Sequence, residues 1–252
     1  MSPGGTAPFR VVAPGKLVLL GEYAVLDGGP ALVLAVDRGV ACDVVPAPVR
    51  EVRAPVHDGR SDTRFVDAAL EAVGAPPARY TFSDVRPLVL PGGAKPGLGG
   101  SAAATVAAVL AGHTAAGRVV GVSERLEQAI AVHREVQGSG SGVDVAASTV
   151  GGVVRWQGGR ADPVVAGPPP LVVVYSGAPA ATGPRVRQYQ GWADRAGFVA
   201  ATMDAVARWG ADPVGAVRDA GGALRRMAEA AGIAYWTPVS YTHLTLPTKR
   251  IV

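Results

Sequence analysis

The segment Lys95-Pro-Gly-Leu-Gly-Gly-Ser-Ala-Ala-Ala104 decides how this sequence folds. Its glycines can take positive φ and let the backbone approach an anion, and Ser101 opens an alanine- and valine-rich run, residues 101–116, that predicts a helix. Free N–H groups at a helix N-terminus favour phosphate, and a serine hydroxyl there can bind Mg²⁺. The segment therefore predicts a phosphate-binding loop that leads into a tightly packed helix.

Two other interpretations of this loop stay open. A simple strand-to-helix turn would also use glycine, and Gly97-x-Gly99-x-x-Ala102 fits the loose dinucleotide-binding pattern. Against a dinucleotide fold, the acidic residue expected about 20 positions later has no strand context, and Lys95 is left unexplained. The loop is not of the Walker type either, because no Gly-Lys-Ser/Thr follows.

Around the loop, strand signals dominate the first half of the chain and helix signals the second, which predicts an α+β fold. A helix is expected to begin at Ser123 as its N-cap and to carry His133 on the face of Leu126. The expected strands are 9–13, 17–20, 31–36, 40–45, 80–90, 152–156 and 171–175, and the other expected helices are 63–73, 198–209 and 214–231.

Lysine is rare in this sequence. Arginine supplies 21 of the 24 basic residues, and the lysines are Lys16, Lys95 and Lys249. Two of them lie in glycine-rich segments, Pro14-Gly15-Lys16 and Lys95-Pro96-Gly97. A compact ammonium suits a phosphate oxygen in a tight site, so this placement favours a function over a surface role.

A third segment of interest runs from His133 to Asp144 and contains a serine-glycine loop. An aspartate between such a loop and an apolar run is placed to act as a partly desolvated base. Taken alone, Asp144 is better explained as the cap of a helix that starts near Val145.

The composition excludes several classes of protein. Of the 252 residues 48% are hydrophobic and 17% charged, as in a folded globular chain, and no apolar run is long enough to span a membrane. The single cysteine, Cys42, predicts a buried structural thiol and, with no secretion signal, a cytoplasmic location. The net charge of +4 is modest, basic residues are scattered and aromatics make up 6%, so no nucleic-acid partner is expected.

Together the three segments resemble one family. Residues 13–23 are similar to the first motif of the GHMP kinase superfamily, 97–103 to the second, and 138–148 to the segment with its catalytic aspartate. Within the superfamily, residues 17–26, 36–38, 137–148 and 176–182 are most similar to the phosphomevalonate kinases. The resemblance runs from about residue 9 to 236.

This resemblance implies a two-domain α+β fold. Residues 9–157 would form an N-terminal ATP-binding domain with a left-handed βαβ unit, and residues 168–238 an incomplete ferredoxin-like C-terminal domain. The implied activity is transfer of the γ-phosphate of ATP to phosphomevalonate, giving diphosphomevalonate for isoprenoid biosynthesis. ATP and Mg²⁺ would be the cofactors, and a small phosphorylated molecule the partner.

The resemblance also implies roles for particular residues. Lys16 and Asp144 would be catalytic, and Ser101 would bind Mg²⁺. The ATP-binding residues would be Lys95, Gly97, Leu98, Gly99, Gly100, Ser101 and Ala102. The substrate-binding residues would be Glu22, Tyr23, His133, Ser139, Ser141 and Gly142.

Two departures from the family pattern matter. The second motif usually has two serines where this chain has Gly100 and Ser101, so the retained serine is taken as the metal ligand. Mevalonate kinases have a magnesium-binding glutamate where this chain has His133, with Glu135 two residues later. His133 either supplies a cation to the extra phosphate of the substrate or is a core histidine whose hydrogen bonds are made within the protein.

The alternatives within the enzyme class are mevalonate kinase and homoserine kinase. A decarboxylase of the same superfamily is disfavoured, because that branch does not carry Lys16 in this context. From another class, the chain could bind nucleotide without turnover.

The composition changes near the C-terminus. Residues 239–252 hold one of three lysines and one of three isoleucines, and they resemble a translated sequencing adapter. The family's third glycine-rich motif is not found after Trp236. We expect this tail to be non-native and the C-terminal domain to be cut short.

Overall fold

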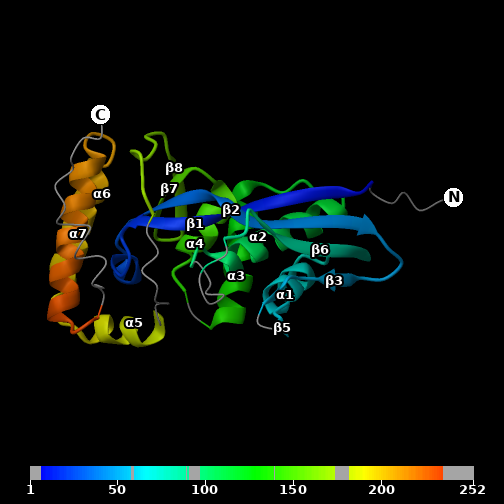
Figure 1. Ribbon diagram of the computed structural model, residues 1–252, viewed down its shortest axis with the longest axis horizontal. Helices are drawn as coiled ribbons and strands as arrows, with labels where there is room; N and C mark the ends of the chain where they lie inside the picture. Colours follow the sequence, from blue (N-terminus) through cyan, green and yellow to red (C-terminus); the bar gives the residue numbers. More distant parts are fainter. Residues whose placement is uncertain are drawn as a thin grey trace. The chain divides into compact units, whose positions relative to one another are not determined.

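A computed structural model describes residues 7–57, 60–88, 90, 97–138, 140–173 and 182–234. These residues form a mixed α+β structure (Figure 1), which confirms the predicted fold class. The chain divides into two compact units: Met1–Leu19 with Ala31–Gly167, and Leu20–Pro30 with Pro168–Val252. Lys95, Ser139, residues 176–181 and the tail 239–252 lie outside the described residues.

The first unit is built on a mixed sheet whose strands lie in the order β3-β6-β2-β7-β8, with β1 also paired to β2. β2 is central because its two halves have different partners: Ala31–Leu34 pairs antiparallel with β7, and Gly39–Pro46 with β6. β3 pairs parallel with β6. The strands are β1 (Phe9–Leu20), β2 (Ala31–Pro46), β3 (Glu51–Arg53), β6 (Ala78–Val85), β7 (Val153–Gln157) and β8 (Arg160–Val164), with a separate ribbon of β4 (Val56–His57) and β5 (Arg60–Ser61).

The first two strands are longer than the sequence predicted. β1 continues through Pro14-Gly15 and β2 through Asp37-Arg38-Gly39, where the sequence suggested breaks. The reason is that these glycines serve close packing. A Cβ on Gly39 would clash with the backbone of Ala13, so only glycine lets the two strands approach at this point.

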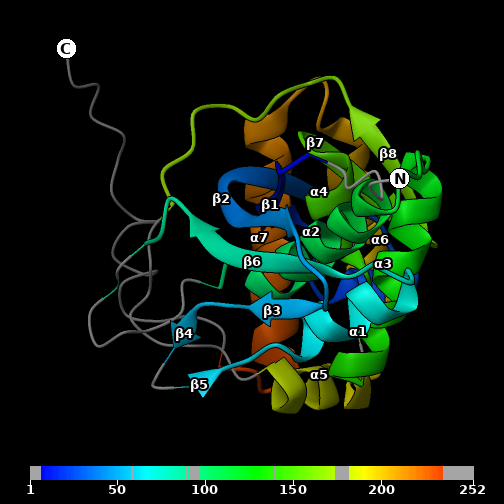
Figure 2. The same cartoon turned by 90° about the vertical axis from the view of Figure 1, so that its right-hand side faces the viewer.

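Four helices lie on one face of this sheet (Figure 2): α1 (Arg64–Ala72), α2 (Gly100–Ala115), α3 (Val122–Gln137) and α4 (Val143–Val150). α2 is central, since it packs against α1, α3, α4 and β2. Its alanines explain the close packing: Ala102, Ala103, Ala107, Ala108 and Ala111 are all fully buried. The helix predicted at 101–116 is therefore confirmed within one residue at each end.

The predicted N-cap of α3 is wrong. The helix begins at Val122 with Gly121 as its N-cap, and Ser123 lies inside the first turn without a capping hydrogen bond. Extended Gly121 already supplies the entry into the helix, which leaves the hydroxyl of Ser123 no capping position. Glu124 lies in the first turn as expected.

The second unit contains the short helix η1 (Ala24–Asp27) and helices α5 (Thr182–Gly191), α6 (Arg195–Arg208) and α7 (Pro213–Ala230). Its core is formed by Ala24, Tyr189, Phe198, Ala223, Leu224, Met227, Ala228 and Ile233. α5 was not predicted because Gly183, Pro184 and its polar residues hide a helical pattern; buried Tyr189 anchors it. Among the described residues, no helix has the length and apolar character needed to cross a membrane.

The strand predicted at 171–175 is not formed in its described part. Leu171, Val172 and Val173 have no regular structure, and Val172 is 91% exposed. An apolar β-rich run becomes a strand only when a neighbour accepts its backbone hydrogen bonds, and no strand among the described residues does so here. The ferredoxin-like arrangement stays a prediction.

The predicted burial of Cys42 is confirmed, since the residue is fully buried on β2. Burial, aided by the charge of Asp43, raises the pKa of the thiol to about 12. At pH 8 only about 10⁻⁴ of the thiol is then ionised, and the thiolate is the reactive form.

We therefore expect the native protein not to react with a water-soluble disulfide reagent at pH 8. Addition of denaturant should release one reactive thiol per chain. Rapid reaction of the native protein, followed by absorbance of the released reagent, would contradict the burial of Cys42.

Candidate active site

The first and second sequence motifs meet where β1 passes the start of α2. The N–H of Lys16 donates a hydrogen bond to the carbonyl of Leu98, with 2.9 Å between N and O. A Cβ on Gly15 would lie 2.5 Å from that same carbonyl oxygen and 2.6 Å from the carbonyl oxygen of Arg38. Glycine at position 15 is therefore what allows the loop to lie directly on β1.

The end of the loop is shaped for an anion. Gly97 and Gly99 have φ of +72° and +75°, and Gly99 is the left-handed N-cap of α2. Among the described residues no side chain caps this helix, and its first turn contains no acidic residue, so the first-turn N–H groups can bind a ligand. The positive end of the helix dipole adds to this preference for a negative group.

Asp144 reaches this place from the third motif. It is the second residue of α4, whose N-cap is Gly142; this glycine has φ of +84° and lies against the ring of Trp156. The indole N–H of Trp156 donates to the carbonyl of Ser141 at 3.1 Å and so fixes the loop. Asp144 Oδ1 lies 3.1 Å from Lys16 Nζ; the side chains are 36% and 16% exposed.

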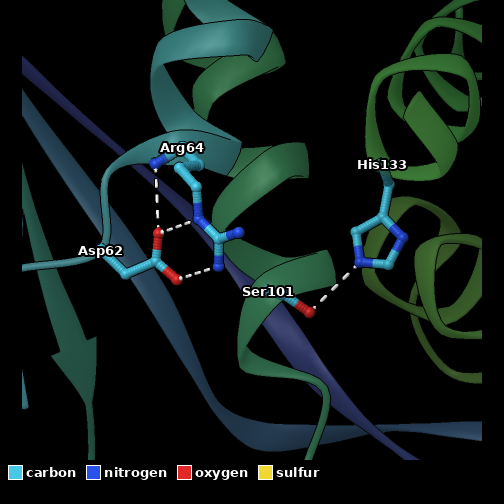
Figure 3. A network of polar contacts seen from close by, with 4 residues as sticks. All are labelled: Asp62, Arg64, Ser101 and His133. Atoms are coloured by element: carbon cyan, nitrogen blue, oxygen red, sulfur yellow. Dashed lines mark hydrogen bonds and ion pairs between the residues drawn. The ribbon is translucent and has the colours of Figure 1, made fainter. Parts of the chain in front are cut away.

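His133 joins α3 to the start of α2. Its Nε2 lies 3.2 Å from Ser101 Oγ (Figure 3), and its ring stacks on Phe65 at a centroid distance of 5.1 Å. The side chain is 7% exposed. Burial lowers the pKa of His133 below its ordinary value of 6.5, and the charge of Asp144 opposes this only in part.

Six of the predicted positions thus make direct contacts with one another within the first unit. Lys16 contacts Leu98, Gly99 and Asp144, and His133 contacts Ser101. Gly100 and Ala102 lie in the same first turn of α2, and Ser141 and Gly142 lead into α4. Lys95 and Ser139 are outside the described residues.

Glu22 and Tyr23 belong to the second unit. Tyr23 has an unusual φ of +64°, and its ring lies 5.3 Å from that of Tyr189. Burial raises the pKa of its hydroxyl, and the nearby charge of Arg185 partly offsets the rise. Their role as substrate-binding residues stays a prediction.

Sequence reasoning missed Phe65 and Trp156. Each holds a predicted residue in place, Phe65 by stacking on His133 and Trp156 by its hydrogen bond to Ser141. No local pattern marks either residue, because their partners lie far away in the chain. The order of the segments in space was the missing information.

The residues present fit a nucleotide and a magnesium ion. No group of three or more His, Cys, Asp or Glu gathers into a metal site within the described ranges. Mg²⁺ usually takes only one or two protein oxygens and completes its shell with phosphates and water. Ser101 Oγ, at the uncapped start of α2, is a suitable oxygen of this kind.

The fold and site together define the class of the protein. Residues 65–152 match the family model described as the GHMP kinases N terminal domain. This segment of the chain is a GHMP kinase N-terminal domain.

Within the superfamily the chain is similar to enzymes that act on mevalonate compounds. It is 36% identical over 182 positions to a phosphomevalonate kinase of a Streptomyces species, covering 58% of this chain and 48% of that protein. It is 37% identical over 149 positions to the mevalonate kinase of Methanothermobacter thermautotrophicus, covering 56% and 48%. The chain thus spans about half the length of these curated relatives.

A solved structure shows the same fold. The phosphomevalonate kinase of Streptococcus pneumoniae superposes with a TM-score of 0.76 at 18% identity, covering 93% of this chain and 83% of that one. At this identity the likeness concerns the fold alone.

The two loop glycines offer a matched test of the site's packing. Both have left-handed φ, so alanine costs roughly 1–2 kcal/mol of strain at either. A Cβ at Gly97 would meet no atom of the described residues within 4 Å, whereas one at Gly99 would lie 2.7 Å from Lys16 Cγ. We expect Gly99→Ala to lower the free energy of unfolding in urea by more than Gly97→Ala does. Equal losses would show that Lys16 is not packed on the loop.

Proposed function

We propose that this chain carries the ATP-binding and catalytic part of a kinase that transfers the γ-phosphate of ATP to phosphomevalonate, giving diphosphomevalonate. The observation that carries the proposal is the 3.1 Å contact of Lys16 Nζ with Asp144 Oδ1 beside the phosphate loop. It supplies a cation and a carboxylate at the uncapped start of α2. The buried free thiol of Cys42 fits the cytoplasm, which is part of this proposal.

In the proposed reaction an acceptor oxygen forms a bond to the γ-phosphorus, and the bond from that phosphorus to the β–γ bridging oxygen breaks. ADP leaves with the electron pair of the broken bond. Catalysis of such a transfer rests mainly on positioning and on electrostatic stabilisation of the spread negative charge. The ammonium of Lys16 and the first-turn N–H groups of α2 supply that stabilisation here.

The part played by Asp144 depends on the acceptor. A phosphate acceptor is already ionised and needs orientation more than a base, so Lys16 carries more weight than Asp144. A hydroxyl acceptor, as in mevalonate kinase, must lose its proton, and Asp144 would then be the base. Relatives of both names match the chain, which makes mevalonate kinase the second candidate.

ATP and Mg²⁺ belong to the proposal. Gly97–Ala102, with Lys95, would hold the ATP phosphates, and the hydroxyl of Ser101 would hold Mg²⁺. When bound, the ion neutralises phosphate charge. Ser101 is held in turn by its neighbours, since Thr105 Oγ1 donates to the carbonyl of Ser101 at 2.9 Å.

A coupled assay of ADP release tests the proposal. The rate at which ADP is formed from ATP is measured with phosphomevalonate, mevalonate or homoserine as the acceptor. We expect the largest kcat/KM with phosphomevalonate. A preference for mevalonate or homoserine would replace the proposed acceptor, and ATP binding without acceptor-dependent ADP release would favour the nucleotide-binding protein without turnover.

Lys16→Met should lower kcat far more than it raises the KM for ATP, because the lysine charge is worth most in the transition state. Arg10→Met is the matched control. Arg10 is also a cation on β1, and it pairs with Asp43 at the same distance of 3.1 Å, but away from the loop. Steady-state kinetics of both variants should show a loss only at Lys16; equal losses would remove Lys16 from the site.

Asp144→Asn should lower kcat by about 10²–10⁴ with an acceptor that needs a base, and by less with one that is already ionised. The matched control is Asp43→Asn, which removes the carboxylate of the remote pair. Kinetics with each acceptor measure the difference. Unchanged turnover in Asp144→Asn with every acceptor would refute its assignment to the site.

A further inference from the structure

Two buried histidines bridge the same pair of helices, α2 and α3, at different places. His133 on α3 meets Ser101 on α2, with Nε2 and Oγ 3.2 Å apart. His113 on α2 meets Gln128 on α3, with Nε2 and Oε1 2.6 Å apart. Ser101 is the second residue of α2 and His113 lies in its last turn, about 18 Å further along at 1.5 Å per residue. Only the first bridge lies at the phosphate loop.

The surroundings of His133 fix its ring. Phe65, the second residue of α1, stacks on it with an interplanar angle of 30°. Helices α1, α2 and α3 all pack on one another, so the ring lies where the three meet. At 7% exposure it has little freedom to turn towards solvent. The position of Ser101 Oγ is therefore set by a rigid neighbour.

This contact prepares the serine oxygen for a cation. His133 Nε2 lies at hydrogen-bond distance from Ser101 Oγ, and an imidazole nitrogen without a proton accepts a hydrogen bond. When the hydroxyl of Ser101 donates to Nε2, both lone pairs of Oγ stay available. A group that accepts a hydrogen bond from a metal-binding side chain orients that side chain and raises its basicity.

We propose that His133 is a positioning residue that acts through Ser101, holding the hydroxyl so that its oxygen faces the nucleotide-bound magnesium. The inference rests on the proposed function. It gives His133 a different role from the substrate-binding one suggested by the sequence.

The geometry disfavours a direct contact of His133 with a substrate phosphate. Such a contact needs a ring nitrogen that a ligand can reach, whereas His133 is buried and its Nε2 already faces Ser101. Lys16, whose Nζ lies 3.1 Å from Asp144 Oδ1, is better placed to supply a cation to a substrate phosphate.

The test compares three variants by calorimetric titration with ADP, with and without Mg²⁺. His133→Phe keeps a flat ring for Phe65 but has no nitrogen, His133→Gln restores an acceptor, and His113→Phe removes the remote bridge. Mg²⁺ should strengthen ADP binding in the wild-type chain. In His133→Phe we expect this enhancement to fall about 10-fold or more, with metal-free ADP affinity unchanged.

The controls separate positioning from general damage. His113→Phe should lower the melting temperature yet keep the full enhancement by Mg²⁺, and His133→Gln should recover most of it. In a double-mutant cycle, His133→Phe should have no further effect once Ser101 is alanine. An undiminished enhancement in His133→Phe, an equal loss in His113→Phe, or additive effects with Ser101→Ala would each overturn the proposal.

The wild-type titration distinguishes the two levels of inference. A wild-type chain that binds no ADP would remove the proposed function and this role with it. Normal ADP and Mg²⁺ binding with an unaltered His133→Phe would overturn the positioning role alone.

Discussion

The close approach of three backbone segments underlies the whole candidate site. At Gly15, β1 lies against the carbonyls of Leu98 and Arg38, and at Gly39 the neighbouring strand lies against β1 in the same way. A single Cβ at either glycine would push these segments apart. Because they meet, the side chain of Lys16 emerges at the start of α2, where the helix dipole and the free N–H groups already favour a negative group.

The pair formed by Lys16 and Asp144 is better explained by chemistry than by stability. Both side chains are partly desolvated, and the cost of removing charges from water offsets much of their attraction. Each charge nevertheless lies beside a glycine turn at a helix N-terminus, Lys16 at that of α2 and Asp144 at that of α4. Charged groups held in such places are more typical of functional sites than of structural ones.

The first motif is divided between the two compact units. Lys16 lies in the first, while residues Leu20–Pro30 belong to the second. In the second unit the carboxylate of Asp27 accepts a hydrogen bond from the hydroxyl of Tyr189 at 2.7 Å and pairs with Arg195 at 3.1 Å. These contacts hold η1, which follows Glu22 and Tyr23 in the chain, against helices α5 and α6. The first motif, which is continuous in sequence, therefore contributes residues to both compact units.

The sequence alone determined the α+β class, the helix after the glycine loop and the motifs around Lys16, Ser101 and Asp144, because local spacing and residue type carry these signals. Only the tertiary structure decided that β1 and β2 run unbroken through their glycines, that α5 is helical, and that Leu171–Val173 is not a strand. It also placed Phe65 on His133 and Trp156 on Ser141. Each of these depends on a partner distant in the chain, and no local pattern records whether that partner is present.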